Sequence, residues 1–227
     1  MLRLENIRKR YGEKTVIRDL SCTVRAGTLT VVAGPNGAGK STLLRLMAGL
    51  ARPDSGTVTV SCDPGGVGYL GHETFLYPHL TALENLAFWQ KLHAKPADDE
   101  TLLAALDGMG LAALADEKAG TFSRGTAQRL SLTRVFLQGP SLLLLDEPLS
   151  GLDEASGKRV REGLAALRDT GAALVWVSHD PAKDAWDADA VIQLLPGGSH
   201  RILTPSEYGA DDFGMPETLP ASGGTPC

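Results

Sequence analysis

The chain has 227 residues, of which 43% are hydrophobic and 22% charged, and its formal net charge is −5. This length suffices for one large α/β domain with a sizeable core. Binding nucleic acid draws on a concentrated basic face, so the acidic balance argues against a nucleic-acid partner.

The cysteine pattern and the hydropathy indicate where the protein works. Cys22, Cys62 and Cys227 are far apart in the sequence, which argues against a disulfide framework or a zinc site and fits a reducing cytosol. No apolar run approaches the ~20 residues of a membrane span, and the first residues lack a signal-peptide core. We expect a cytosolic protein that partners hold at a membrane, if it works there.

Residues 1–70 are predicted to be rich in β-structure. Alternating or β-branched segments predict strands at 1–4, 16–24, 29–33 and 57–60. The segment at 29–33 runs directly into a glycine-rich loop, and apolar residues at helical spacing follow over 42–50. Residues 65–70 are interpreted as the lead into a linker.

The middle of the chain is predicted to be helical. Thr81 and Glu84 form a capping box at the start of a helix over 81–93. Further helices are predicted over 100–114, with interruptions at two glycines, and over 123–137. We therefore expect an α-helical subdomain over about 73–137, inserted into the α/β domain.

The remaining segments predict an α/β sheet. Apolar strands at 142–145, 172–177 and 190–195 alternate with a helix at 154–169, which is typical of a parallel sheet covered on both faces. A single domain over 1–208 is expected, and the Gly-, Pro- and acid-rich residues 209–227 are predicted to be a disordered tail.

The clearest functional signal is a phosphate-binding loop. The sequence from Gly34 to Thr42 satisfies G-x-x-x-x-G-K-[ST] between a predicted strand and helix. In this interpretation backbone N–H groups and the helix start surround phosphate oxygens, Lys40 reaches the β- and γ-phosphates of ATP, and Ser41 ligates Mg²⁺. The predicted nucleotide-binding residues are Gly34, Asn36, Gly37, Ala38, Gly39, Lys40, Ser41 and Thr42.

Two carboxylates follow the buried strand at 142–145. Residues at the carboxyl ends of parallel strands lie where open α/β sheets bind ligands. Asp146 is predicted to hold Mg²⁺ through water, and Glu147 to orient and polarise the attacking water. The alternative is that these carboxylates cap a following helix.

Between and after these motifs the chain resembles the ABC ATPase family. Residues 122–130, F-S-R-G-T-A-Q-R-L, are similar to the signature L-S-G-G-Q with Q-x-R; Arg124 and Thr126 depart from it. Residues 150–153, S-G-L-D, resemble the D-loop, and His179 resembles the switch histidine. The resemblance implies a P-loop NTPase core with an N-terminal antiparallel β subdomain and an inserted α-helical subdomain.

The resemblance also implies roles for residues outside the phosphate loop. Tyr11 would stack on adenine, His179 would be catalytic with Glu147 and Lys40, and a second copy would present Ser123, Gly125 and Asp153 to the nucleotide. Two copies would then enclose two ATP molecules. Taken singly, Ser123 could be a simple N-cap, Tyr11 a core aromatic and His179 a histidine beside a strand.

Residues 69–86 resemble the haem-exporter ATPase of the cytochrome c maturation (Ccm) system. That family has histidine where most ABC ATPases have glutamine, here His72, and it works with separately encoded transmembrane subunits. The resemblance implies a peripheral protein on the cytoplasmic face of the inner membrane. His72 is a candidate metal residue with Ser41 and Asp146, although Mg²⁺ prefers oxygen ligands, so its action through water remains open.

Several alternatives remain for the transported species and the class of protein. The chain could serve another exporter that moves a drug, lipid or polysaccharide. It could also be a soluble ABC ATPase of translation or DNA repair, or a regulatory nucleotide-binding module with little hydrolysis. A guanidinium at Arg124 could add positive charge near the γ-phosphate held by a second copy, or lie in solvent.

Overall fold

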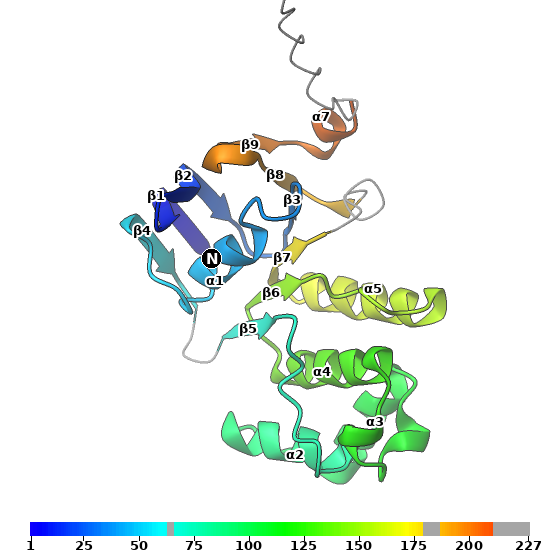
Figure 1. Cartoon of the computed structure of the whole chain (residues 1–227). Helices are drawn as coiled ribbons and strands as arrows, with labels where there is room; N and C mark the ends of the chain where they lie inside the picture. Colours follow the sequence, from blue (N-terminus) through cyan, green and yellow to red (C-terminus); the bar gives the residue numbers. More distant parts are fainter. Residues whose placement is uncertain (63–65, 179–186, 211–227) are drawn as a thin grey trace, which may run out of the picture.

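The computed structural model describes residues 1–62, 66–178 and 187–210. A six-stranded sheet forms its centre, with strand order β5-β6-β7-β3-β8-β9 (Figure 1). All neighbouring strands run parallel except β8 and β9, which pair antiparallel. Their bounds are β3 Leu29–Ala33, β5 Val67–Leu70, β6 Leu142–Asp146, β7 Ala173–Val177, β8 Ala190–Leu194 and β9 His200–Leu203. The predicted parallel sheet is confirmed.

A second sheet of three strands is built from the N-terminal third of the chain. Its order is β2-β1-β4, and both pairings are antiparallel. The strands are β1 Leu2–Tyr11, β2 Lys14–Val24 and β4 Ser55–Val60. Their apolar side chains join one buried cluster with those of helix α1 (Lys40–Met47), so this sheet and the central sheet enclose that helix.

The helical segment is inserted between β5 and β6. It contains α2 Ala82–Leu92, α3 Asp99–Gly108 and α4 Arg124–Gln138, with 3₁₀ turns at Ala112–Leu114 and Ala119–Thr121. The capping box of Thr81 and Glu84 is present at the start of α2. In Figure 1 this lobe lies at the end of the molecule opposite β9 and the short helix α7 (Pro205–Ala210).

Two apolar clusters cover the two faces of the central sheet, because alternate residues of each strand point to opposite faces. On β6, Leu142 and Leu144 belong to the cluster with α1, whereas Leu143 and Leu145 belong to the other. The second cluster continues through helix α5 (Glu154–Asp169) into the helical lobe. The lobe therefore shares its core with the sheet.

The structure differs from the sequence-based expectations at short elements. Residues 67–70 form the edge strand β5 of the central sheet, whereas we expected them to lead into a linker. Strand β9 and helix α7 were not anticipated, and α7 extends to Ala210, two residues past the expected domain end. These elements have six residues or fewer, too few to show a clear period.

The helix expected over 100–114 is also shorter. Helix α3 ends at Gly108, and Gly110 adopts a left-handed φ of 67° before a 3₁₀ turn carries the chain to Leu114. Across the described residues, the structure contains no helix with the length and apolar character needed to cross a membrane. His179 and residues 211–227 of the expected tail lie outside the described residues.

Candidate nucleotide-binding site

The glycine loop lies between β3 and α1, and at two of its positions the backbone conformation and the close neighbours allow only glycine. Gly34 adopts a φ of 140°, and a side chain there would overlap the carbonyl oxygen of Leu194 on β8. Gly39, the N-cap of α1, adopts a φ of 106° and lies directly against Val16. The loop therefore packs between β8 and β2, and it ends where α1 begins.

Lys40 lies inside the loop. Its Nζ donates hydrogen bonds to the carbonyl oxygens of Gly34 at 2.7 Å and Pro35 at 3.3 Å, and the residue is buried. Burial lowers the pKa of Lys40 below its ordinary value, while the carboxylates of Glu147 and Asp146 oppose that shift. This lysine is therefore a cation surrounded by backbone, close to two acidic groups.

The carboxyl end of β6 carries two carboxylates in different settings. Asp146 is 2% exposed, and neither of its carboxylate oxygens has a hydrogen-bond partner. Glu147 has a φ of 55°, which is rare for a residue other than glycine, and its N–H donates to the carbonyl of Val177. A buried carboxylate without a partner is costly, so Asp146 is suited to holding a cation.

His72 joins these carboxylates from the neighbouring strand. Its Nε2 lies 3.5 Å from Oδ2 of Asp146. Ligand atoms of His72, Asp146 and Glu147 all lie within 4.8 Å of one another. His72 follows β5, whose Leu70 pairs with Leu145, so the register of the parallel sheet brings this histidine beside Asp146.

A cavity of about 400 Å³ opens at the loop and collects most of the predicted residues. Tyr11, at the end of β1, lies on its wall with its ring exposed. Lys14 also lines it and donates to the carbonyl oxygen of Gly37 at 3.4 Å. Sequence reasoning did not single out Lys14; its position three residues after Tyr11 was the available signal. The full lining is Tyr11, Lys14, Val16, Asn36, Gly37, Gly39, Lys40, Ser41, Thr42, His72 and Glu147.

Five predicted nucleotide contacts do not line this cavity: Gly34 and Ala38, which belong to the loop itself, and Ser123, Gly125 and Asp153. Ser123 is the N-cap of α4, where its side chain accepts from the N–H of Thr126 and its Oγ lies 2.9 Å from the Thr126 hydroxyl. Thr126, one of the departures from the signature, therefore supports the cap.

Gly125 lies against the loop before α5. A Cβ at Gly125 would lie 2.9 Å from the carbonyl oxygen of Gly151. Asp153 is the N-cap of α5 and accepts from the N–H of Ser156 at 2.7 Å, and hydrogen bonding to Ser156 lowers the pKa of its carboxyl. The signature-like helix and the D-loop-like segment are thus neighbours that form a second surface.

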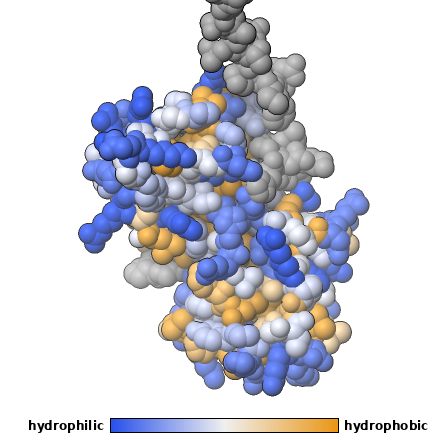
Figure 2. Space-filling view, viewed as in Figure 1, coloured by the Kyte–Doolittle hydropathy of each residue, from blue (hydrophilic) through white to orange (hydrophobic). Residues whose placement is uncertain are grey.

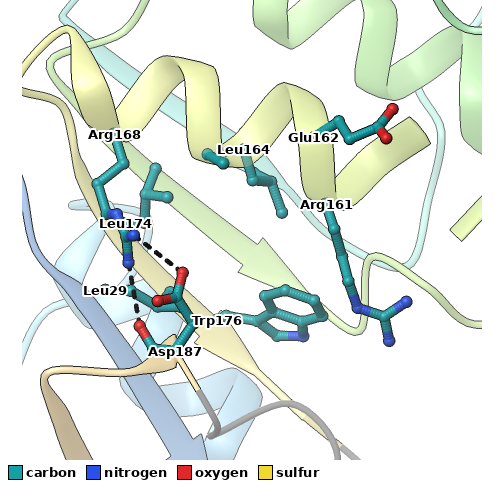
Figure 3. Close-up of a pocket in the computed structure, with 9 residues that line it drawn as sticks. Leu29, Arg161, Glu162, Leu164, Arg168, Leu174, Trp176 and Asp187 are labelled. Carbon is teal, nitrogen blue, oxygen red and sulfur yellow. Dashed lines mark hydrogen bonds and ion pairs between the residues drawn. The ribbon is translucent and has the colours of Figure 1, made fainter. Parts of the chain in front are cut away.

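A second hollow lies between α5 and the central sheet (Figure 3). It measures about 200 Å³, and its apolar wall includes Leu164, Leu174 and Trp176. Arg168 and Asp187 form an ion pair of 2.9 Å at its side. Its apolar lining does not suit a triphosphate, whereas the glycine loop with Lys40 does.

The strand, glycine loop and helix, with a lysine inside the loop and carboxylates on the adjoining strand, define the class of P-loop nucleotide-binding proteins. More particularly, the chain belongs to the ABC transporter family, whose model matches residues 17–150.

Three curated relatives of this chain have names that refer to different transport systems. The linearmycin resistance ATP-binding protein LnrL of Bacillus subtilis is 37% identical over 79% of this chain and 61% of that protein. The cytochrome c biogenesis ATP-binding export protein CcmA of Gluconobacter oxydans is 41% identical over 80% of this chain and 82% of that protein. The spermidine/putrescine import protein PotA of Haemophilus influenzae is 32% identical over 93% of this chain. The chain spans about three fifths of LnrL and PotA.

Solved structures share the fold. An ATP-binding subunit of an ABC transporter superimposes with a TM-score of 0.82 at 23% identity, covering 92% of this chain and 93% of that one. The ATP-binding cassette MJ0796, in a dimeric post-hydrolysis state with ADP and Pi, gives 0.77 at 25% identity, covering 90% of this chain and 99% of that one. The expected fold class is confirmed.

Proposed function

We propose that this chain is the ATP-hydrolysing subunit of an ABC transporter, the haem exporter of cytochrome c biogenesis. The observation that carries the hydrolytic function is the buried Asp146 carboxylate, which has no hydrogen-bond partner and lies beside the loop that holds Lys40. Such a carboxylate fits a cation bound with ATP, because the cation would compensate its buried charge.

The roles of the site residues follow from their positions. Loop N–H groups, the start of α1 and Lys40 bind the phosphates, and Tyr11 stacks on adenine. Ser41, Asp146 and His72 would hold Mg²⁺, and a bound ion would neutralise charge on the β- and γ-phosphates. Glu147 accepts a hydrogen bond from the attacking water and orients it. His179, outside the described residues, is assigned by resemblance to contact the γ-phosphate.

A second copy of the chain completes each site in this proposal. Ser123, Gly125 and Asp153 lie away from the cavity and therefore have no phosphate to contact within their own chain. The N-terminal end of α4 suits an anion, because its N–H groups and dipole favour negative charge. Two copies facing each other bring these groups to the partner's ATP. The dimeric state of MJ0796 with ADP and Pi supports this arrangement.

Figure 2 shows hydrophobic residues gathered on the helical lobe. Phe75, Tyr77, Phe88 and Leu92 are exposed there. The rings of Tyr77 and Phe88 meet edge to face, with centroids 4.6 Å apart. An exposed aromatic group is typical of an interface, and we assign it to separately encoded transmembrane subunits at the cytoplasmic face of the inner membrane.

Haem export is proposed among the possible transport systems because the chain is 41% identical to CcmA, against 37% for LnrL and 32% for PotA, and because residues 69–86 resemble the haem-exporter ATPase. The main alternative is the ATPase of another exporter, which the 37% identity with LnrL supports. In both cases ATP hydrolysis by this chain would drive export.

The test of the proposed function is genetic and biochemical. Deleting the gene in the source organism should abolish c-type cytochromes detected by haem staining, and the wild-type gene should restore them. The Lys40→Ala and Glu147→Gln variants should not restore them although each chain accumulates. Intact c-type cytochromes in the deletion strain would refute haem export. Lost resistance to a toxic compound in that strain would favour the drug exporter.

A further inference from the structure

A third hollow opens where the helical lobe meets α5. It measures about 360 Å³ and is lined by the end of α3, the second half of α4 and the middle of α5. In Figure 1, α4 lies between α5 and α3. None of the residues that line this hollow lines the nucleotide-binding cavity, so the two spaces are separate.

Small residues keep this hollow open. On α3, Ala105 and Gly108 line it from one face of the helix, being three positions apart, and a Cβ at Gly108 would meet no atom within 4 Å. On α5, Gly163 lies against the ring of Phe136, because a Cβ at Gly163 would come within 2.6 Å of Cε2. Helices α4 and α5 thus meet closely at this ring, while the two small residues of α3 leave the space beside them unfilled.

The wall of the hollow suits an apolar group. Met109, Phe136 and Leu137 contribute apolar side chains to it. Thr133 also lines it, but its hydroxyl donates to the carbonyl oxygen of Arg129 in the same helix at 2.9 Å. An apolar ligand would therefore leave water without depriving this hydroxyl of its acceptor.

One cation lies at the hollow without an ionic partner. The guanidinium of Arg159 lies against the end of α3, since a Cβ at Gly110 would be 3.5 Å from its Nε. No ion pair joins Arg159 to any residue that the structure describes. Glu162, the acidic residue of the same wall, lies 3.8 Å from Lys158. The nearby Arg129 donates to two carbonyl oxygens at the end of α3, which leaves Arg159 as the charge available to a ligand.

We propose that this hollow binds a small amphipathic carboxylate, whose apolar chain lies between α3, α4 and α5 and whose carboxylate pairs with Arg159. The planar guanidinium presents paired N–H donors that match the two oxygens of a carboxylate. The volume of about 360 Å³ falls within the range of about 300–1,000 Å³ that is typical of ligand pockets. Binding here does not depend on ATP, because the nucleotide-binding cavity has a different set of residues.

The test uses the full-length chain without nucleotide, octanoate as the probe and 1-octanol as its uncharged counterpart. Methionine methyl groups are labelled with ¹³C and followed by NMR. Met109 lines the hollow, whereas Met47 is fully buried in the cluster around α1. Octanoate should shift the Met109 signal to saturation and leave the Met47 signal unchanged. 1-Octanol should bind about tenfold more weakly, because it lacks the charge-assisted pair with the guanidinium.

Two matched pairs of substitutions test the contacts. Ala105→Leu fills the hollow and should abolish octanoate binding, whereas Ala104→Leu, at the exposed neighbouring position, should not. Arg159→Gln should weaken octanoate binding about tenfold, to the affinity of 1-octanol, while Lys158→Gln leaves it unchanged. Circular dichroism checks that each variant is folded.

Three results would overturn the proposal. The first is a Met109 shift that does not saturate with octanoate. The second is equal affinity of the unaltered chain for octanoate and 1-octanol, which would exclude pairing with Arg159. The third is equal octanoate binding by the Ala105→Leu and Ala104→Leu variants, which would place the ligand outside this hollow.

Discussion

The guanidinium carbon of Arg134 lies 4.4 Å from the centroid of the Trp89 ring, and this contact joins α4 to α2. Neither Nε of Arg134 nor Nε1 of Trp89 has a hydrogen-bond partner, and both atoms are buried. Burial lowers the pKa of Arg134 to about 10. The guanidinium thus contacts an aromatic face and donates from Nη2 to Ser131 Oγ at 3.4 Å, and desolvated cation–π pairs are among the stronger ones.

Replacing Arg134 should therefore loosen the helical lobe. We expect Arg134→Ala to lower the free energy of unfolding by about 2 kcal/mol, because both the stacked guanidinium and the packed stem are lost. Arg134→Lys should cost about half as much, since it retains charge without the planar group. Urea unfolding measures both. Lys91→Ala, on the exposed side of α2, is the control, and a loss equal to that of Arg134→Ala would contradict the assignment.

His93 makes the stability of the same aromatic group depend on pH. Its ring stacks on Trp89 with centroids 6.2 Å apart. Burial, followed by the charges of Arg134 and Lys95, lowers the pKa of His93 below its ordinary value of 6.5. As the pH falls through that value, the unfolded chain takes up the proton first, so the folded state loses stability until both forms are protonated.

We therefore expect the melting temperature to fall between about pH 7 and pH 5, and to fall less in His93→Phe, which keeps the ring without the titrating nitrogen. Thermal unfolding followed by circular dichroism at several pH values measures the difference. His79→Gln serves as the control for replacing a histidine outside this stack. Parallel profiles for His93→Phe and the unaltered chain would exclude His93 as a source of the acid sensitivity.

Substitutions of Lys40 and Glu147 should distinguish ATP binding from ATP hydrolysis. Lys40→Ala removes the cation inside the loop and should abolish ATP binding as well as turnover. Glu147→Gln should retain ATP and reduce turnover at least about 100-fold, because the general base is lost. The retained ATP should trap a dimer, visible by size-exclusion chromatography. Turnover by the unaltered chain should rise faster than linearly with its concentration; a linear rise indifferent to Glu147 would exclude paired sites.

Gly125 should be sensitive to a single methyl group. A Cβ there would lie 2.9 Å from the carbonyl oxygen of Gly151, which is closer than backbone tolerates. Gly125→Ala should therefore displace the segment before α5 and weaken ATP-driven dimerisation while leaving ATP binding near Lys40 intact. Gly108→Ala, where the added carbon meets nothing within 4 Å, should stabilise the chain by about 0.5–1 kcal/mol. Equal effects of the two substitutions would contradict the close packing at Gly125.

Local features were predictable from the sequence because their determinants lie within three or four residues. The capping box of Thr81 and Glu84 is present, and α5 has the predicted bounds Glu154–Asp169. The glycine loop lies between β3 and α1 as its motif requires. Asp146 could be assigned to the end of a buried strand because an uninterrupted apolar run precedes it.

The relationships that depend on strand pairing could not be predicted in the same way. Strand β5 has four residues, and only its pairing with β6 identifies it as part of the central sheet. That pairing places His72 beside Asp146, a grouping that the resemblance to ABC ATPases implied but that no local pattern encodes. The Arg134–Trp89 stack likewise depends on how α4 packs against α2.

The sequence by itself determined the loop chemistry, the helix caps and the alternation of strands and helices, because backbone conformation and hydrogen bonding along the chain depend on near neighbours. The tertiary structure decided which side chains from distant segments share a site. It placed His72 beside Asp146 and in one cavity with Ser41, and kept Ser123 and Asp153 on another surface. The physical reason is that sheet register and helix packing are set by burial of the whole core.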